Sequence, residues 1–227
     1  KLHLLRNTIH FGGQTGWLYG VAFLPLADVF AIEFTAPIWT ALLAILFLKE
    51  RLNRYRALSI FLGFTGIIII LRPGFQIIQP AAFIVLFASF CFASTYVLTR
   101  YRSATDSPLT LIFYKTRGQL ALGFIASLYN WALPSLESWP WLALLGLTGI
   151  GSHFCFANAF RYGDAIVVTP IDFIRLPLIA LIGWSIYNES WDLVIFVGGT
   201  VIFSGNLINL LAEQKFAKKS SETNTRA

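Results

Sequence analysis

The chain has 227 residues, of which 56% are hydrophobic, 16% aromatic and 12% charged, and it carries a net charge of +6. A soluble globular domain carries about 25% charged residues, so half that share excludes an ordinary soluble fold and indicates lipid as the surrounding solvent. The positive charge gathers between apolar segments, so membrane topology accounts for it and no nucleic-acid partner is expected.

Eight segments are apolar over the length that a membrane-spanning helix needs, about 20 residues. Proline, glycine and clustered charges separate them. In chain order the predicted spans are residues 4–24, 27–48, 55–71, 80–100, 108–130, 140–160, 164–187 and 191–212. Residues 213–227 form a polar tail, for which the composition predicts disorder. The fold class is therefore an all-α membrane protein with eight transmembrane helices.

Lysine and arginine distinguish the two sides of these spans. Alternating through eight spans puts 13 of the 17 basic residues on one side, whereas the opposite loops hold only Arg72. Basic loops of membrane proteins stay in the cytoplasm. Both termini are therefore predicted to be cytoplasmic, with the chain passing through the lipid bilayer several times.

The first span has two distinct faces. His10, Gln14 and Trp17 recur at positions i, i+4 and i+7, which gives one polar and aromatic stripe. This stripe is predicted to line a substrate cavity, unless Gln14 bonds to a neighbouring helix while Trp17 faces lipid. The other face has small residues at a four-residue spacing, typical of close helix packing: Gly12, Gly16 and Gly20.

The second span places Glu33, Pro37 and Thr40 on a single face. Glu33 lies nearer the periplasmic end, so substrate binding, gating and snorkelling to the interface all remain open for it. Glu50 and Glu189 precede the third and eighth spans, and a carboxylate near the N-terminus of a helix stabilises that helix.

Four further ionisable side chains lie deep within later spans. At about 1.5 Å per residue they are roughly 12–20 Å from a span end, near the middle of a ~30 Å hydrocarbon core: Arg117, His153, Asp172 and Arg175. Such groups face a cavity or a partner. Arg117 shares its helix face with Tyr114, whereas Lys115 points away from it and is expected to snorkel to the interface.

Asp172 and Arg175 are three residues apart and can pair on one helix face. The flanking Pro170 and Pro177 free backbone carbonyls, which is tolerated where a helix lines a cavity. One interpretation is a structural ion pair that neutralises both groups. The other is a kinked, charged wall of a translocation path, in which Arg117 is an alternative partner for Asp172.

The second span and its exit recur about 139 residues later, from Asp164 to Glu189. The first exit is basic and the second has no Lys or Arg, as inverted repeats require. Counting back, two spans would precede Lys1, which gives ten helices in two five-helix inverted repeats. The predicted domains are 1–71, the last three helices of a truncated first repeat, 80–212, the second repeat, and the cytoplasmic tail 213–227.

Two stretches resemble the EamA-type transporters of the drug/metabolite superfamily: Thr35-Ala36-Pro37 through Leu48-Lys49-Glu50-Arg51-Leu52, and the echo that ends in Asn188-Glu189. The family usually has Gly before this Glu, where this chain has Lys49 and Asn188. The resemblance implies a bacterial inner-membrane protein that moves small metabolites by alternating access. It leaves the substrate open, although the seventh span is most similar to relatives of S-adenosylmethionine and riboflavin importers.

Enzymatic motifs are missing from the sequence. The three histidines have no metal-binding spacing, and no phosphate-binding glycine loop follows a strand. We therefore expect a non-enzyme without metal or cofactor. Its expected partners are a small-molecule metabolite and the lipid bilayer, with a homodimer left open. The alternative function is a membrane channel or receptor with a polar path.

Overall fold

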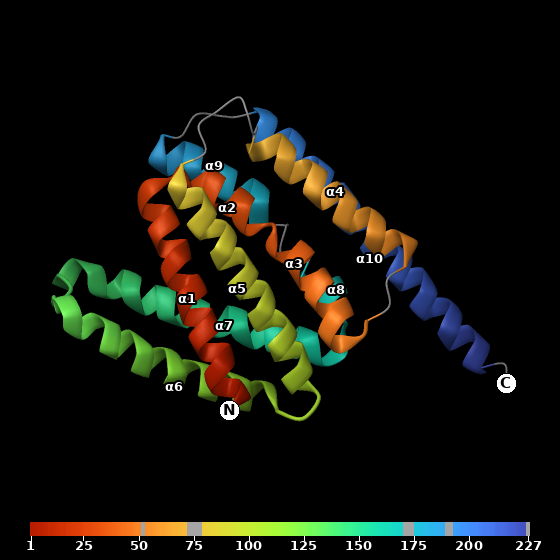
Figure 1. The fold of residues 1–227 in the computed structure, drawn as a ribbon, viewed down its shortest axis with the longest axis horizontal. Coiled ribbons are helices and arrows are strands. Elements are labelled where there is room, and N and C mark those ends of the chain that lie inside the picture. Colours follow the sequence, from red (N-terminus) through yellow and green to blue (C-terminus); the bar gives the residue numbers. More distant parts are fainter. Residues whose placement is uncertain (51–52, 72–78, 170–174, 189–192, 226–227) are drawn as a thin grey trace.

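The structure is a computed structural model that describes residues 1–50, 53–71, 79–169, 175–188 and 193–225 (Figure 1). All regular structure in these ranges is helical. The helices are α1 (Leu2–Phe23), α2 (Leu26–Glu33), α3 (Ala36–Leu43), α4 (Arg54–Leu71), α5 (Pro80–Ser103), α6 (Pro108–Ser127), α7 (Trp139–Tyr162), α8 (Ala165–Val168), α9 (Arg175–Tyr187) and α10 (Leu193–Thr225). A π-helical turn, Ala44–Leu48, extends α3, and short 3₁₀ turns at Leu128–Asn130 and Leu136–Ser138 flank the loop between α6 and α7.

Helices occupy each of the eight predicted spans, but not always one helix per span. The second span is divided into α2 and α3, and the seventh into α8 and α9 with undescribed residues between them. In the described residues, three helical stretches are long and apolar enough by themselves to cross a membrane, namely Asp28–Leu48, Pro80–Ser103 and Leu136–Tyr162.

The C-terminal tail differs from its prediction. Helix α10 continues to Thr225, so the disorder predicted from residue 213 onward is wrong as far as that residue. The segment is polar, yet it is rich in Ala, Glu, Gln and Lys, which are good helix formers. An existing helix is also cheaper to extend than a new one is to begin.

Helix α5 lies at the centre of the bundle, against α1, α2, α3, α6, α7 and α8 (Figure 1). Small side chains allow this close approach. A Cβ on Gly13 of α1 would lie 2.8 Å from the Cβ of Cys91, and one on Gly20 only 2.1 Å from Val85. Gly16 also contacts α5, while Gly12 meets nothing, so the predicted glycine face is confirmed except at Gly12.

The second span breaks at Phe34 and Thr35 because of Pro37. Proline has no N–H, and its ring clashes with the carbonyl four residues earlier, here that of Glu33. Helix α2 therefore ends at Glu33, and the Thr35 carbonyl receives the first N–H bonds of α3, from Ile38 and Trp39 at 3.0 and 3.2 Å. The break leaves Glu33 inside the bundle.

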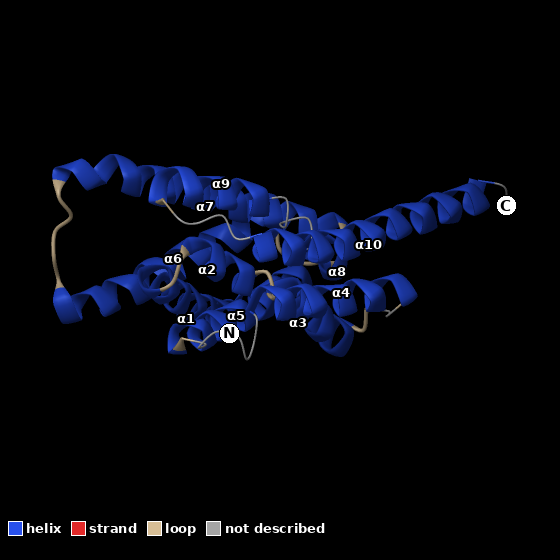
Figure 2. Cartoon of the chain, turned by 90° about the horizontal axis from the view of Figure 1, so that it is seen from above, coloured by secondary structure: helices blue, strands red, loops and turns tan. Residues whose placement is uncertain are grey.

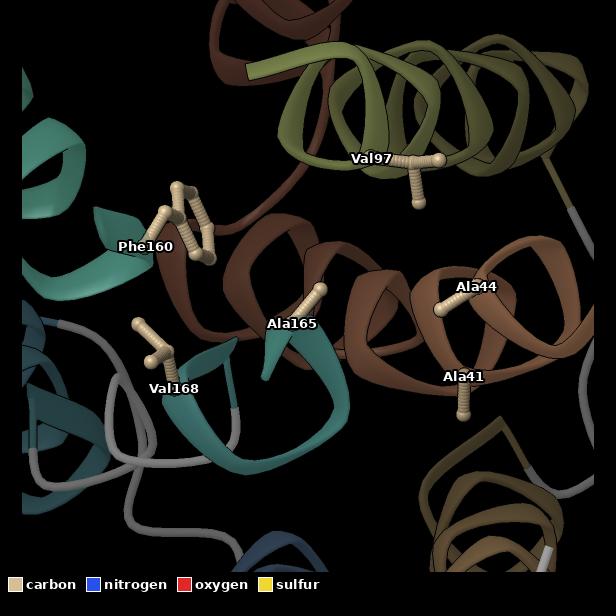
Figure 3. Packing of buried hydrophobic residues seen from close by; sticks show 6 residues of the cluster. All are labelled: Ala41, Ala44, Val97, Phe160, Ala165 and Val168. Carbon is tan, nitrogen blue, oxygen red and sulfur yellow. The ribbon is translucent and has the colours of Figure 1, made fainter. Parts of the chain in front are cut away.

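A buried apolar cluster joins the second half of this broken span to the second half of the chain. Figure 3 shows Phe160 of α7 and the α8 side chains beside the ribbon of α3, with Val97 of α5 above them. The cluster consists of Ala41, Ala44, Val97, Phe160, Ala165 and Val168. Four helices are held together by apolar packing at this point.

Helices α6 and α7 are the least covered part of the bundle. Figure 2 shows their far ends apart from the other helices and joined by the loop of residues 131–135. Only 6% of the apolar window in Leu136–Tyr162 is buried within the chain. In a membrane protein such a surface faces lipid or another helix.

Two residues share an unusual backbone conformation. Lys49 has φ 56° and Asn188 has φ 52°, the left-handed region, and they are the only non-glycine residues with positive φ among those described. They are 139 residues apart; Lys49 follows the π-helical turn that ends the second span, and Asn188 follows α9. These are the two positions at which the resembling family usually has glycine, which adopts this conformation without steric cost.

Glycine at position 49 should therefore stabilise the protein. We expect Lys49→Gly to raise the free energy of unfolding by about 1 kcal/mol, because it removes the left-handed penalty of a side chain. Lys49→Ala is the matched control, since it removes the same charge but keeps a Cβ. The measurement is the thermal unfolding midpoint in detergent, and equal midpoints for the two variants would contradict this explanation.

Candidate substrate site

The first polar group in the bundle is centred on the carboxylate of Glu33, which accepts hydrogen bonds from two other helices. The indole Nε1 of Trp17 donates a hydrogen bond to its Oε2 at 2.6 Å, and the guanidinium of Arg175 pairs with its Oε1. The glutamate residue is only 6% exposed. Its two oxygens thus receive donors from α1 and α9, two helices far apart in the sequence. We call these three residues the carboxylate junction.

Aromatic rings surround the cation of this junction. The guanidinium carbon of Arg175 lies 5.3 Å from the ring centroids of both Phe30 and Phe34. Trp17 meets the Phe30 ring edge to face, with centroids 5.4 Å apart. A guanidinium placed over two aromatic faces is stabilised by their quadrupoles as well as by its carboxylate partner. The junction is therefore a compact unit of charge and aromatic surface.

The junction brings together three of the predicted site residues. Trp17, Glu33 and Arg175 all lie in it, so snorkelling of Glu33 to the interface is wrong, because its side chain is buried. Asp172 lies outside the described residues, and its predicted pairing with Arg175 stays a prediction. Within the described residues, Arg175 pairs with Glu33, 142 residues away.

A second polar group lies between α1, α5, α6 and α7. Arg6 and His10 of α1 are 3% and 7% exposed. Arg6, Lys115 of α6 and His153 of α7 line one pocket, and the rings of His10 and His153 meet edge to face at 5.3 Å. We call Arg6, His10, Lys115 and His153 the basic pocket. Its cavity of about 20 Å³ holds roughly one water molecule.

Hydrogen bonds fix one wall of the basic pocket. The Arg6 guanidinium donates to the carbonyl of Leu111 at 2.6 Å. One turn further along α6, the side-chain amide of Asn7 donates to the carbonyl of Tyr114 at 2.7 Å, and the backbone carbonyl of Asn7 accepts from the side-chain amide of Gln119 at 2.9 Å. These bonds set the rotation of α6 against α1. That rotation turns Lys115 inward.

The rotation of α6 corrects two predictions. Lys115 does not snorkel, because its ammonium nitrogen is buried. Arg117, two residues on, lies on the exposed face of α6 and not in either polar group. Tyr114 is also exposed, with its ring stacked on His3 at 4.3 Å. The residues that sequence reasoning missed are thus Arg6 and Lys115.

The predicted stripe on α1 is divided between the two polar groups. His10 faces the basic pocket, Trp17 belongs to the carboxylate junction, and Gln14 between them is exposed. Arg6 lies four residues before His10, so the same helical spacing would have extended the stripe to it. Because Arg6 also lies close to the N-terminus, its charge contributes to the predicted sidedness of the membrane.

A third polar group closes the end of the bundle near the N-terminus, which we call the basic end because Lys1, Arg56, Arg100 and Arg161 lie there. Asp164, between α7 and α8, accepts from Arg56 of α4 and from Arg100 of α5, both at 3.1 Å. Arg100 also donates to the carbonyl of Phe160 at 2.7 Å. One carboxylate therefore joins three parts of the chain.

Glu50 adds a further contact at the basic end. Its carboxylate accepts the backbone N–H of Ala165 at 3.1 Å, so it caps the start of α8. This contact is with a helix 115 residues away, and the effect of Glu50 on the N-terminus of the third span stays a prediction. Glu189, its counterpart, lies outside the described residues. Among those that are described, no group of three or more His, Cys, Asp or Glu is arranged to hold a metal ion.

Comparison with known proteins decides the family. The sequence profile of the EamA-like transporter family matches residues 4–72 and 79–211. The chain belongs to the EamA-like transporter family. It is therefore a membrane transporter of small metabolites, and the relatives below are transporters, not enzymes.

Two named transporters are similar to this chain over most of its length. An S-adenosylmethionine uptake transporter of Rickettsia bellii is 27% identical over 96% of this chain and 75% of its own length. A riboflavin transporter of Brucella anthropi is 28% identical over 91% of this chain and 75% of its own. One solved crystal structure, 14% identical, covers 95% of this chain and 88% of its own with a TM-score of 0.66, which shows a shared fold.

Removing the charge of Glu33 should destabilise this transporter. We expect Glu33→Gln to lower the free energy of unfolding by about 1–3 kcal/mol, because Arg175, which is 35% exposed, loses the charge of its partner. The exposed Glu137→Gln is the matched control and should change little. Thermal unfolding of the detergent-solubilised protein measures the difference. Equal midpoints for both variants would show that the junction does not stabilise the fold.

Proposed function

We propose that this protein carries a small polar or amphipathic metabolite across the bacterial inner membrane by alternating access. The observation that supports this most strongly is the carboxylate junction. A buried carboxylate lies where a spanning helix is broken, and its partners come from both ends of the sequence. Transporters of inverted-repeat type bind cargo near the midplane at such discontinuous helices.

Two polar contacts join the halves of the chain at different depths. Glu33 bonds to Arg175 inside the bundle, and Asp164 bonds to Arg56 at the basic end. A carrier must close its path on one side while opening the other, so contacts of this kind must break in turn. The nearly filled basic pocket, between these depths, fits a state in which the path is closed at the basic end.

We further propose the ten-helix arrangement of two inverted five-helix repeats, with both termini in the cytoplasm. The positions of Glu33 and Asp172 differ by 139, as do those of Lys49 and Asn188. A carboxylate and a left-handed residue thus recur at matching positions of the second and seventh spans. The uncovered apolar surface of α7 supports further helices beside it. The basic end would then face the cytoplasm.

The cargo proposed on the strength of the relatives is a metabolite of the size of S-adenosylmethionine or riboflavin. Both the junction and the basic pocket contribute to its binding in this proposal. The predicted residues His10, Trp17, Glu33, His153 and Arg175 keep their proposed role. Gln14, Tyr114 and Arg117 are exposed, so we place them outside the path.

A transport assay tests the mechanism. Proteoliposomes loaded with unlabelled S-adenosylmethionine, or with riboflavin in a parallel set, should take up the labelled compound transiently against its gradient. Such counterflow requires a site that is exposed to one side at a time. Uptake without counterflow, or single-channel currents in planar bilayers, would contradict a carrier and favour the channel alternative.

A further inference from the structure

The basic pocket holds more positive charge than its surroundings neutralise. Arg6 is always protonated and is 3% exposed. Its Nε and the Nζ of Lys115 are buried without a hydrogen-bond partner, and so is the Nδ1 of His10. No acidic residue is among the described residues that line the pocket. Burying charge without a partner is costly, and such groups in a membrane span mark functional sites.

The carboxylate that interacts electrostatically with Arg6, that of Asp106, is already engaged. Asp106 accepts two bonds from Arg102, at 2.6 and 2.8 Å, and contacts His3 Nε2 at 3.1 Å. Arg102 therefore neutralises part of the charge of Asp106, and less of that charge acts on Arg6. Arg6 and Arg102, which stay protonated, together face this one carboxylate, so a surplus of positive charge remains beside the pocket.

The hydrogens that have no acceptor in the pocket belong to its basic side chains. The hydroxyl of Thr95 in α5 donates a hydrogen bond to the carbonyl of Cys91 at 2.9 Å, and that of Thr99 donates to the carbonyl of Thr95 at 2.7 Å. The free hydrogens therefore belong to the guanidinium, the ammonium and the imidazole rings. A group with several acceptor oxygens and a negative charge matches such a set.

We propose that the basic pocket binds the carboxylate of the transported metabolite, with Arg6 and Lys115 as its direct partners. This inference rests on the proposed function and narrows its substrate class. S-adenosylmethionine carries a carboxylate, whereas riboflavin has none. The pocket therefore favours an amino-acid-like cargo over a flavin. Its volume of about 20 Å³ means that it must widen when cargo arrives.

Lys115 is the residue to change, because its ammonium has no partner to lose. Arg6 holds a backbone carbonyl of α6, so its replacement could unfold the helix pair. The matched control is Arg117→Gln, two residues away on the same helix, with the same loss of charge on an exposed face. Lys115→Gln without ligand should be at least as stable as the wild type, since it removes an uncompensated buried charge.

Binding to purified full-length protein in detergent tests the site, with S-adenosylmethionine and its decarboxylated form as probes. We expect Lys115→Gln to weaken binding of S-adenosylmethionine about ten- to hundredfold, the loss expected for one charged hydrogen bond. Arg117→Gln should bind like the wild type. The decarboxylated probe should bind wild type and Lys115→Gln equally. Equal weakening of both probes, or a less stable ligand-free Lys115→Gln protein, would overturn the proposal.

Sodium acetate separates this inference from the proposed function. At matched ionic strength, acetate should raise the unfolding midpoint of the wild type above that in chloride, and less so for Lys115→Gln. That result would support the anion site even if neither S-adenosylmethionine nor riboflavin were transported. Equal stabilisation of the two proteins by acetate would remove Lys115 from any carboxylate site, whatever the outcome of transport.

Discussion

The burial of one carboxylate constrains the rest of this structure. Glu33 lies at the end of α2, in a span that Pro37 breaks, and at 6% exposure it has almost no contact with solvent. A charge in such a setting needs donors for both oxygens. Trp17 and Arg175 supply them, which fixes α1 and α9 against the break. Glycines on α1 then allow the close contact with α5 around which the bundle is arranged.

The polar groups form a sequence along the bundle. The carboxylate junction lies at the break, the basic pocket lies between α1, α5, α6 and α7, and Asp164 closes the basic end. Negative charge at the junction is compensated, whereas positive charge in the pocket is not. We therefore infer that the junction stabilises the fold and that the basic pocket binds a ligand. In the proposed carrier, the third group holds helices that move, the junction both holds helices and contributes to binding, and the basic pocket binds the carboxylate of the cargo.

The spans could be predicted because a membrane helix is recognised by the length of one continuous apolar segment, which is a local property of the sequence. Sequence reasoning also placed Trp17, Glu33 and Arg175 among the candidates, since charged and aromatic groups within a span are conspicuous. It did not pair Glu33 with Arg175, because 142 residues separate them and only packing brings them together. The choice between Lys115 and Arg117 failed for a similar reason. The rotation of α6 depends on bonds from Asn7 that no spacing reveals.

In the proposed carrier, contacts between the two halves close the path at the basic end, and transport requires them to break. Thr99 lines the basic pocket, so a cysteine at this position, in a protein without Cys91 and Cys155, reports on opening. The measurement is its labelling rate with a membrane-impermeant maleimide in inside-out vesicles. Asp164→Asn should raise that rate several-fold, because Arg56 and Arg100 lose their shared carboxylate, whereas Glu137→Gln should leave it unchanged. An unchanged rate in Asp164→Asn would contradict the account.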